Sequence, residues 1–162
     1  MVIRVAKTAG FCFGVARAMD MVEALLTENL QSEEKQEIYS LGEIIHNPQA
    51  MQALTARGLH IADGVDEIPD GVTVIARTHG SARSVYALLQ EKKARIVDTT
   101  CPYVAKIQKI VEQAEQEGKA VWIAGDRNHP EIQGILGYCE QAPSYTFLNQ
   151  VQLAQIVKNE PR

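Results

Sequence analysis

Short apolar runs that alternate with amphipathic stretches restrict the fold of this chain more than any other feature. The runs predict strands at residues 2–6, 38–45, 72–78, 95–100, 120–125 and 144–148. The stretches between them carry apolar side chains at helical spacing, first at Val15, Met19, Val22 and Leu26. Strands that alternate with helices predict an α/β fold, in which helices flank mainly parallel sheets.

Further helices are predicted at 48–57, at 82–92 and near 151–157, and a long helix is predicted to end before Gly118. The long helix has one apolar face, made of Val104, Ile107, Ile110, Val111 and Ala114. A loop rich in Asp, Glu, Pro and Gly connects two elements at 63–71. No internal repeat interrupts this alternating pattern.

Charge and cysteine content exclude several classes of function. The 162 residues include 16 Lys and Arg against 20 Asp and Glu, giving a net charge of −4 without a basic stripe for nucleic acid. No signal peptide and no apolar run of about 20 residues is present, so we expect a cytoplasmic protein without a membrane partner. Three cysteines without a C-x-x-C pair argue against a disulfide framework and a zinc ribbon.

Five reactive side chains follow predicted strands directly, at points where a helix begins. They are Cys12, His46, His79, Cys101 and His129. The carboxyl ends of parallel strands meet at one edge of a sheet, and ligands bind at that edge. We therefore expect these five side chains to converge on one site.

The residue types indicate what the site would bind. Three imidazoles suit an anionic group such as a phosphate, and two thiolates suit a soft metal or an iron–sulfur cluster. Glu131, two residues after His129, is a candidate proton relay, whereas Cys139 is expected to be structural. Two other functions stay open: a non-catalytic metal- or phosphate-binding module, with zinc held by both cysteines and a histidine, or a thiol enzyme with Cys12 as nucleophile.

Five segments resemble, in the same order, the motifs of one family, the LytB/IspH 4-hydroxy-3-methylbut-2-enyl diphosphate reductases. The segments are Gly-Phe-Cys-Phe-Gly-Val-Ala-Arg-Ala at 10–18, Ile-His-Asn at 45–47, Thr-His-Gly at 78–80, Asp-Thr-Thr-Cys-Pro at 98–102 and His-Pro-Glu at 129–131. The resemblance implies a cloverleaf of three α/β lobes around a [4Fe-4S] cluster, with one cysteine ligand from each lobe.

The resemblance also implies how the chain is divided and what each residue does. Residues 1–98 would form a first lobe with Cys12, His46 and His79, and residues 99–162 an incomplete second lobe with Cys101, His129 and Glu131. The third lobe, with the third cysteine ligand, would be absent. Cys12 and Cys101 would bind the cluster, His46, His79 and His129 would hold the substrate diphosphate, and Glu131 would be the catalytic proton donor.

The implied reaction is a two-electron reductive dehydroxylation, the last step of the methylerythritol phosphate pathway of isoprene biosynthesis. It converts the allylic diphosphate substrate to isopentenyl and dimethylallyl diphosphates, with electrons from a ferredoxin- or flavodoxin-type protein. We expect the isolated chain to be inactive because a ligand and a lobe would be missing. We also expect its bare sheet edges to favour self-association.

Overall fold

Two parallel sheets organise the computed structural model, which describes residues 1–160. The four-stranded sheet contains β1 (Ile38–Leu41), β2 (Leu59–Ala62), β3 (Thr73–Ala76) and β4 (Arg95–Asp98), in the order β2-β1-β3-β4. The second sheet pairs β5 (Val121–Ala124) with β6 (Ser144–Phe147). The predicted α/β fold with parallel sheets is therefore confirmed. The last two residues of the expected second lobe, Pro161 and Arg162, lie outside the described residues.

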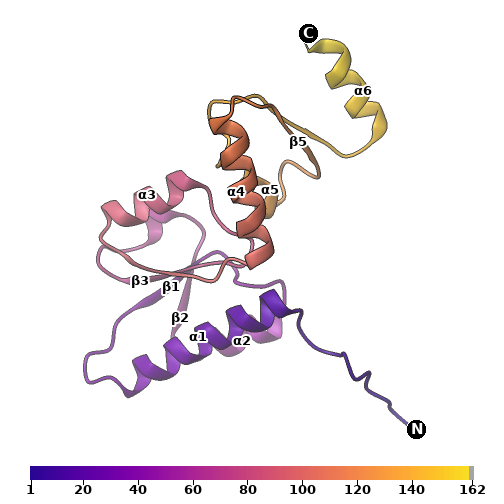
Figure 1. Ribbon diagram of the computed structural model, residues 1–162. Helices are drawn as coiled ribbons and strands as arrows, with labels where there is room; N and C mark the ends of the chain where they lie inside the picture. The colour runs from indigo at the N-terminus through magenta and orange to yellow at the C-terminus, as the bar shows by residue number, and fades with distance from the viewer. Residues whose placement is uncertain (161–162) are drawn as a thin grey trace.

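Helices flank both sheets, as Figure 1 shows. They are α1 (Phe13–Gln31), α2 (Pro48–Thr55), α3 (Arg83–Glu91), α4 (Pro102–Gln116), α5 (Pro130–Leu136) and α6 (Gln150–Asn159), with a 3-10 helix, η1, at Val65–Glu67. Through residue 160, none of them has both the length and the apolar content needed to cross a bilayer.

Three hydrophobic cores follow from this layering. One core lies between α1, α2 and one face of the four-stranded sheet, where Val22 and Leu26 meet Ile38 and Ile75. The opposite face packs against α3 through Leu89, which joins a core with Val74. Side chains that alternate along a strand point to opposite faces, which explains this division.

The third core belongs to the second sheet, where Val111 of α4 and Ile135 of α5 pack against Val121. Cys139 is buried in this core, and its thiol donates a hydrogen bond to the carbonyl of Ala142 at 3.4 Å. The burial and the hydrogen bond agree with the structural role expected for this cysteine.

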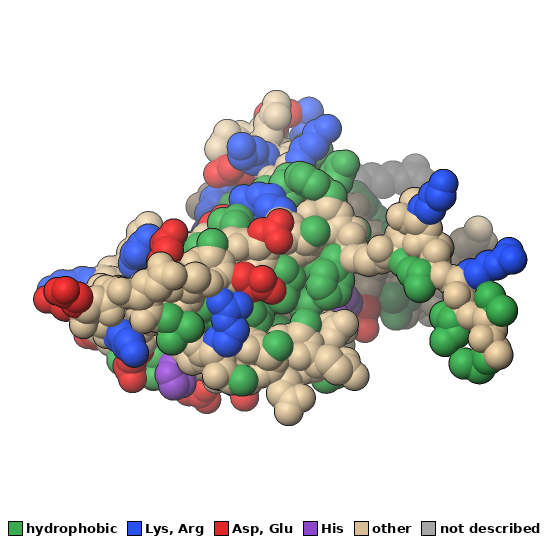
Figure 2. Space-filling view, turned by 90° about the horizontal axis from the view of Figure 1, so that it is seen from below, with side chains coloured by type: hydrophobic (Ala, Val, Ile, Leu, Met, Phe, Trp, Pro, Cys, Tyr) green, Lys and Arg blue, Asp and Glu red, His purple; other side chains and the backbone are tan. Residues whose placement is uncertain are grey.

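The strand predicted at 2–6 is wrong. Residues 1–12 form no helix or strand, and Val2, Ile3 and Val5 are exposed on an arm that leaves the body of the molecule (Figures 1 and 2). A strand exists only where another strand satisfies its backbone groups. Within the described residues no strand pairs with this arm, so it forms no strand and its apolar side chains remain exposed.

The apolar face of α4 is narrower than its sequence suggests. Val104 and Val111 are buried, but Ile107 and Ile110 are exposed. The helix makes its main contacts with α5 and β5. Part of the apolar face of α4 therefore has no packing partner among the described residues.

Candidate functional site

Three histidines from distant parts of the sequence lie against one another. The ring centroids of His46 and His79 are 4.8 Å apart, and those of His79 and His129 are 5.9 Å apart with the rings nearly perpendicular. His46 follows β1, His79 follows β3, and His129 caps α5. The predicted convergence of these imidazoles is confirmed. We call them the histidine cluster.

Short polar contacts hold the first two histidines in place. The hydroxyl of Thr78, next to His79, donates to the carbonyl of Ile44 at 2.8 Å, and both groups are buried. This bond joins the turn that carries His79 to the loop that carries His46. Asn47 then caps α2 by accepting from the amide of Ala50 at 3.0 Å, which fixes the backbone directly after His46.

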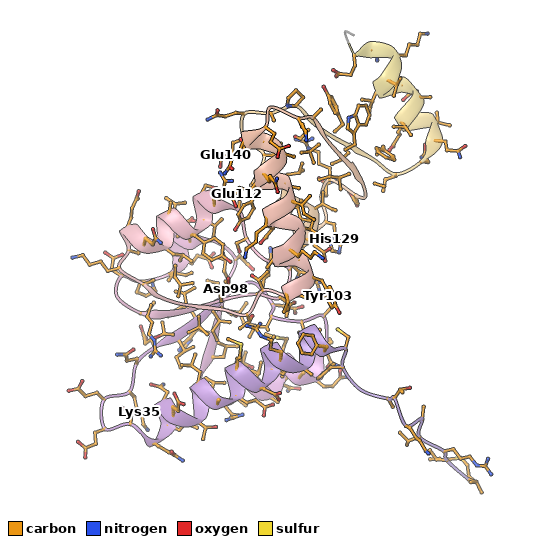
Figure 3. All side chains as sticks on the ribbon, in the orientation of Figure 1. Lys35, Asp98, Tyr103, Glu112, His129 and Glu140 are labelled. Carbon is orange, nitrogen blue, oxygen red and sulfur yellow. The ribbon has the colours of Figure 1, made fainter. Side chains whose placement is uncertain are left out.

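His129 is held by its own helix. Its Nδ1 accepts a hydrogen bond from the backbone N–H of Glu131 at 3.2 Å. In the neutral ring the proton must therefore sit on Nε2, which remains available as a donor. Figure 3 shows His129 beside α4, above the start of that helix where Tyr103 lies. Glu131 is partly buried in the first turn of α5, and its role as proton donor stays a prediction.

The electrostatics of the cluster centre on His79. Burial is the largest cause that lowers its pKa, and together with the nearby His46, Arg77 and His129 it brings the pKa to about 4. His79 is therefore neutral at pH 7. Its Nδ1 is buried without a hydrogen-bond partner among residues 1–160, which leaves the ring with unused hydrogen-bonding capacity.

Arg77 is a charged neighbour that the sequence reasoning did not select. Burial lowers the pKa of its guanidinium, and its Nε has no hydrogen-bond partner in the described chain. The guanidinium lies close to Gly42, where an added Cβ would come within 2.7 Å of Nη1. The sequence already places Arg77 at the end of a predicted strand, two residues before His79, and this position could have identified it as a site residue.

The two cysteines cap neighbouring helices. Cys12 is the N-cap of α1 and exposed, and Cys101 is the N-cap of α4 and partly buried. A Cβ added to Gly14 would lie 2.6 Å from the Sγ of Cys101, so the first turn of α1 touches this thiol. Arg17 also donates from Nη1 to the carbonyl of Thr100 at 3.3 Å. The starts of α1 and α4 are therefore in contact.

The cysteine pair adjoins the histidine cluster. The backbone N–H of Cys101 donates to the carbonyl of Thr78 at 2.9 Å, which places this cysteine beside the residue before His79. All five predicted junction residues thus come from adjoining segments. Of the two glycines that flank Cys12, Gly14 makes room for Cys101, and nothing lies within 4 Å of a Cβ added to Gly10.

The donor set fits part of an iron–sulfur site. Thiolate sulfur is the ligand that such clusters require, and Cys12 and Cys101 bring two thiols to adjacent helix starts. Among residues 1–160, no three His, Cys, Asp or Glu side chains gather closely enough to hold a metal ion. Cys139 belongs to the core of the second sheet and adds no ligand.

Comparison with known proteins places this arrangement in context. The sequence profile of the LytB protein family matches residues 3–161. The 4-hydroxy-3-methylbut-2-enyl diphosphate reductase of Caldanaerobacter subterraneus is 40% identical over 142 residues, covering 86% of this chain and 48% of the relative. The enzyme of the same name from Clostridioides difficile is 42% identical over 142 residues, covering 88% and 49%.

Solved structures give the same result. One (E)-4-hydroxy-3-methyl-but-2-enyl diphosphate reductase, the terminal enzyme of the non-mevalonate pathway, superposes with a TM-score of 0.78 at 37% identity, covering 98% of this chain and 55% of that one. The E-1-hydroxy-2-methyl-but-2-enyl-4-diphosphate reductase of Plasmodium falciparum gives 0.80 at 27% identity, covering 96% and 46%. The chain spans about half the length of the curated relatives it matches.

Proposed function

Because the chain belongs to the LytB protein family, we propose that it forms the diphosphate- and cluster-binding part of a 4-hydroxy-3-methylbut-2-enyl diphosphate reductase. The observation that carries the proposal is the contact between His46, His79 and His129. This histidine cluster adjoins a pair of cysteine-capped helix starts. An anion site beside two soft-metal ligands fits the reduction of an allylic diphosphate at an iron–sulfur cluster.

In this proposal the histidine cluster binds the diphosphate. His79 is neutral at neutral pH and offers an N–H without charge, because burial and the nearby His46, Arg77 and His129 hold its pKa near 4. His129 offers Nε2–H, because its Nδ1 already accepts from the amide of Glu131. The exposed His46 completes the set from the loop after β1. The three rings come from three separate elements, so they can contact different phosphate oxygens.

Cys12 and Cys101 are the proposed ligands of a [4Fe-4S] cluster. When bound, such a cluster supplies electrons and an open iron position that acts as a Lewis acid on the substrate's hydroxyl group. We assign the delivery of protons to Glu131, which follows His129 in the first turn of α5. Two electrons and two protons release the hydroxyl as water, and a ferredoxin- or flavodoxin-type protein is the proposed electron source.

Binding of inorganic diphosphate to the 162-residue chain tests the anion site. We expect isothermal titration calorimetry to detect binding, and His46→Ala, His79→Ala and His129→Ala each to weaken it. A hydrogen bond to a charged group contributes about 1.5–3 kcal/mol, so each loss corresponds to roughly 10- to 100-fold in Kd. His60→Ala, which changes an exposed histidine of β2 that stacks on Tyr39, is the matched control. Equal affinity in all four variants would contradict the proposal.

Anaerobic reconstitution with iron and sulfide tests the second half. We expect Cys12→Ser and Cys101→Ser to lower the bound iron and sulfide, whereas Cys139→Ala, in the core of the second sheet, leaves them unchanged. Loss of iron in the Cys139 variant alone would refute the assignment. Zinc without sulfide in the purified chain would favour the metal-binding module instead.

A further inference from the structure

Helix α5 packs on the turn that carries His79 with backbone against backbone. A Cβ added to Gly134 would lie 3.1 Å from the carbonyl oxygen of Gly80 and 3.3 Å from that of His79. A Cβ added to Gly137 would lie 2.1 Å from the Cβ of Ala82 and 2.6 Å from its Cα. Ordinary carbon contacts are about 3.5–4.0 Å, so a side chain at either position would force the two segments apart.

Polar contacts close the same interface at its far end. The carbonyl of Gly137 accepts from the backbone N–H of Arg83 at 3.4 Å. The guanidinium of Arg83 lies 5.1 Å from the ring centroid of Tyr138 and 3.0 Å from the carboxylate of Glu112. Figure 3 shows Glu112 on α4. We call the contact of residues 79–83 with Gly134 and Gly137 the α5 seam.

The α5 seam controls the distance between two members of the histidine cluster. His79 begins the segment on one side of the seam, and His129 caps the helix on the other side. Gly134 is five residues from His129, about 7.5 Å along a helix, so α5 transmits a displacement at the seam to His129. The 5.9 Å between the rings of His79 and His129 therefore depends on how closely α5 approaches.

We propose that Gly134 and Gly137 are positioning residues for the histidine cluster, which set the spacing of His79 and His129 by admitting α5 to backbone contact. Neither glycine carries a side chain that could touch a ligand. This inference rests on the proposed binding of a diphosphate by the cluster, and it assigns the geometry of that site to residues outside it.

The two glycines differ in the size of the expected effect. Alanine at 134 requires a displacement of a few tenths of an ångström against two backbone carbonyls, which approaches the ~0.5 Å that binding sites tolerate. We therefore expect Gly134→Ala to weaken diphosphate binding by roughly 2- to 3-fold. Gly137→Ala requires more than about 1 Å, and we expect at least a 10-fold loss. Alanine favours helix formation over glycine, so α5 itself is not weakened.

Calorimetry with inorganic diphosphate on the 162-residue chain tests the seam, and circular dichroism confirms that each variant is folded. Gln133→Ala, an exposed position on the same helix, is the control and should bind like the parent chain. Adding Ala82→Gly to Gly137→Ala removes the contacted Cβ and should restore part of the affinity. No such rescue exists for Gly134, because its contacts are backbone atoms. If Gly137→Ala does not fold, Gly134→Ala carries the test.

An NMR titration of His79 gives a readout that does not depend on ligand. Displacement of α5 moves His129 away from His79 and uncovers its ring, so the pKa of His79 should rise from about 4 in Gly134→Ala but not in Gln133→Ala. A parent chain that fails to bind diphosphate would refute the proposed function, and the titration would still decide the inference. Unchanged titration and unchanged affinity in Gly134→Ala would overturn the inference alone.

Discussion

Acidification is expected to destabilise this chain through His79. Burial and neighbouring charges lower the pKa of this ring from 6.5 to about 4. Between these values His79 is protonated in the unfolded chain but not in the folded chain, so the free energy of unfolding falls as the pH falls from 6.5 to 4. Above pH 6.5 and below pH 4, His79 should not make the free energy of unfolding change with pH. The full difference corresponds to about 3 kcal/mol, and because the ring is only half-buried, solvent screening reduces this to roughly 1–2 kcal/mol.

Urea unfolding at pH 7 and pH 4 measures this loss, and His79→Gln provides the comparison. Glutamine keeps a neutral polar side chain but does not titrate, so the variant should lose about 1–2 kcal/mol less than the parent chain over the same interval. Other titrating groups are present in both proteins, so their contributions cancel in the comparison. Equal losses, or an NMR titration of His79 centred near 6.5, would refute the reasoning.

Two further substitutions test the contacts around the site. Gly14→Ala places a Cβ 2.6 Å from the Sγ of Cys101, so the thiol must move by about 1 Å. We expect a trivalent arsenical to bridge Cys12 and Cys101 more slowly in this variant. Overpacking costs about 1–3 kcal/mol, and the better helix propensity of alanine offsets part of it, so the free energy of unfolding should stay within about 2 kcal/mol of the parent chain. Unchanged bridging would contradict this, with the exposed Asp20→Ala as control. Thr78→Val leaves the buried carbonyl of Ile44 without its hydroxyl donor and should cost about 1–3 kcal/mol in urea unfolding. Thr55→Val, which removes an exposed hydroxyl bond, should cost under about 0.5 kcal/mol, and equal costs would count against the buried bond.

Local sequence patterns were sufficient for most elements and for two members of the histidine cluster. The spacing of Val15, Met19, Val22 and Leu26 predicts α1, and three of these four side chains are buried. His46 and His79 converge because β1 and β3 are parallel neighbours that end at one edge of the four-stranded sheet. His129 follows β5 of the second sheet and comes to the other two rings as the N-cap of α5, so its place does not follow from that rule. The catalytic and ligand roles of the site residues, and the lobe boundary at residue 98, stay predictions.

Features that depend on distant partners could not be read from the sequence. The apolar pattern of residues 2–6 does not reveal whether another strand lies beside it. The apolar face that contains Ile107 and Ile110 does not show which side of α4 packs against other elements. The α5 seam was also missed, although glycines three apart at 134 and 137 signal close packing. In each case the missing information is the identity of the facing segment.

The histidine cluster and the cysteine pair both join segments that adjoin the four-stranded sheet to helices that pack on the second sheet. A ligand held by His79 and His129 together would therefore fasten the two sheets, and its binding free energy would add to the stability of their junction. Helix α5 has only seven residues, too few to persist without its packing. Its amide protons would exchange with solvent through opening of that junction, so their exchange rates would report occupancy of a site that most of them never touch.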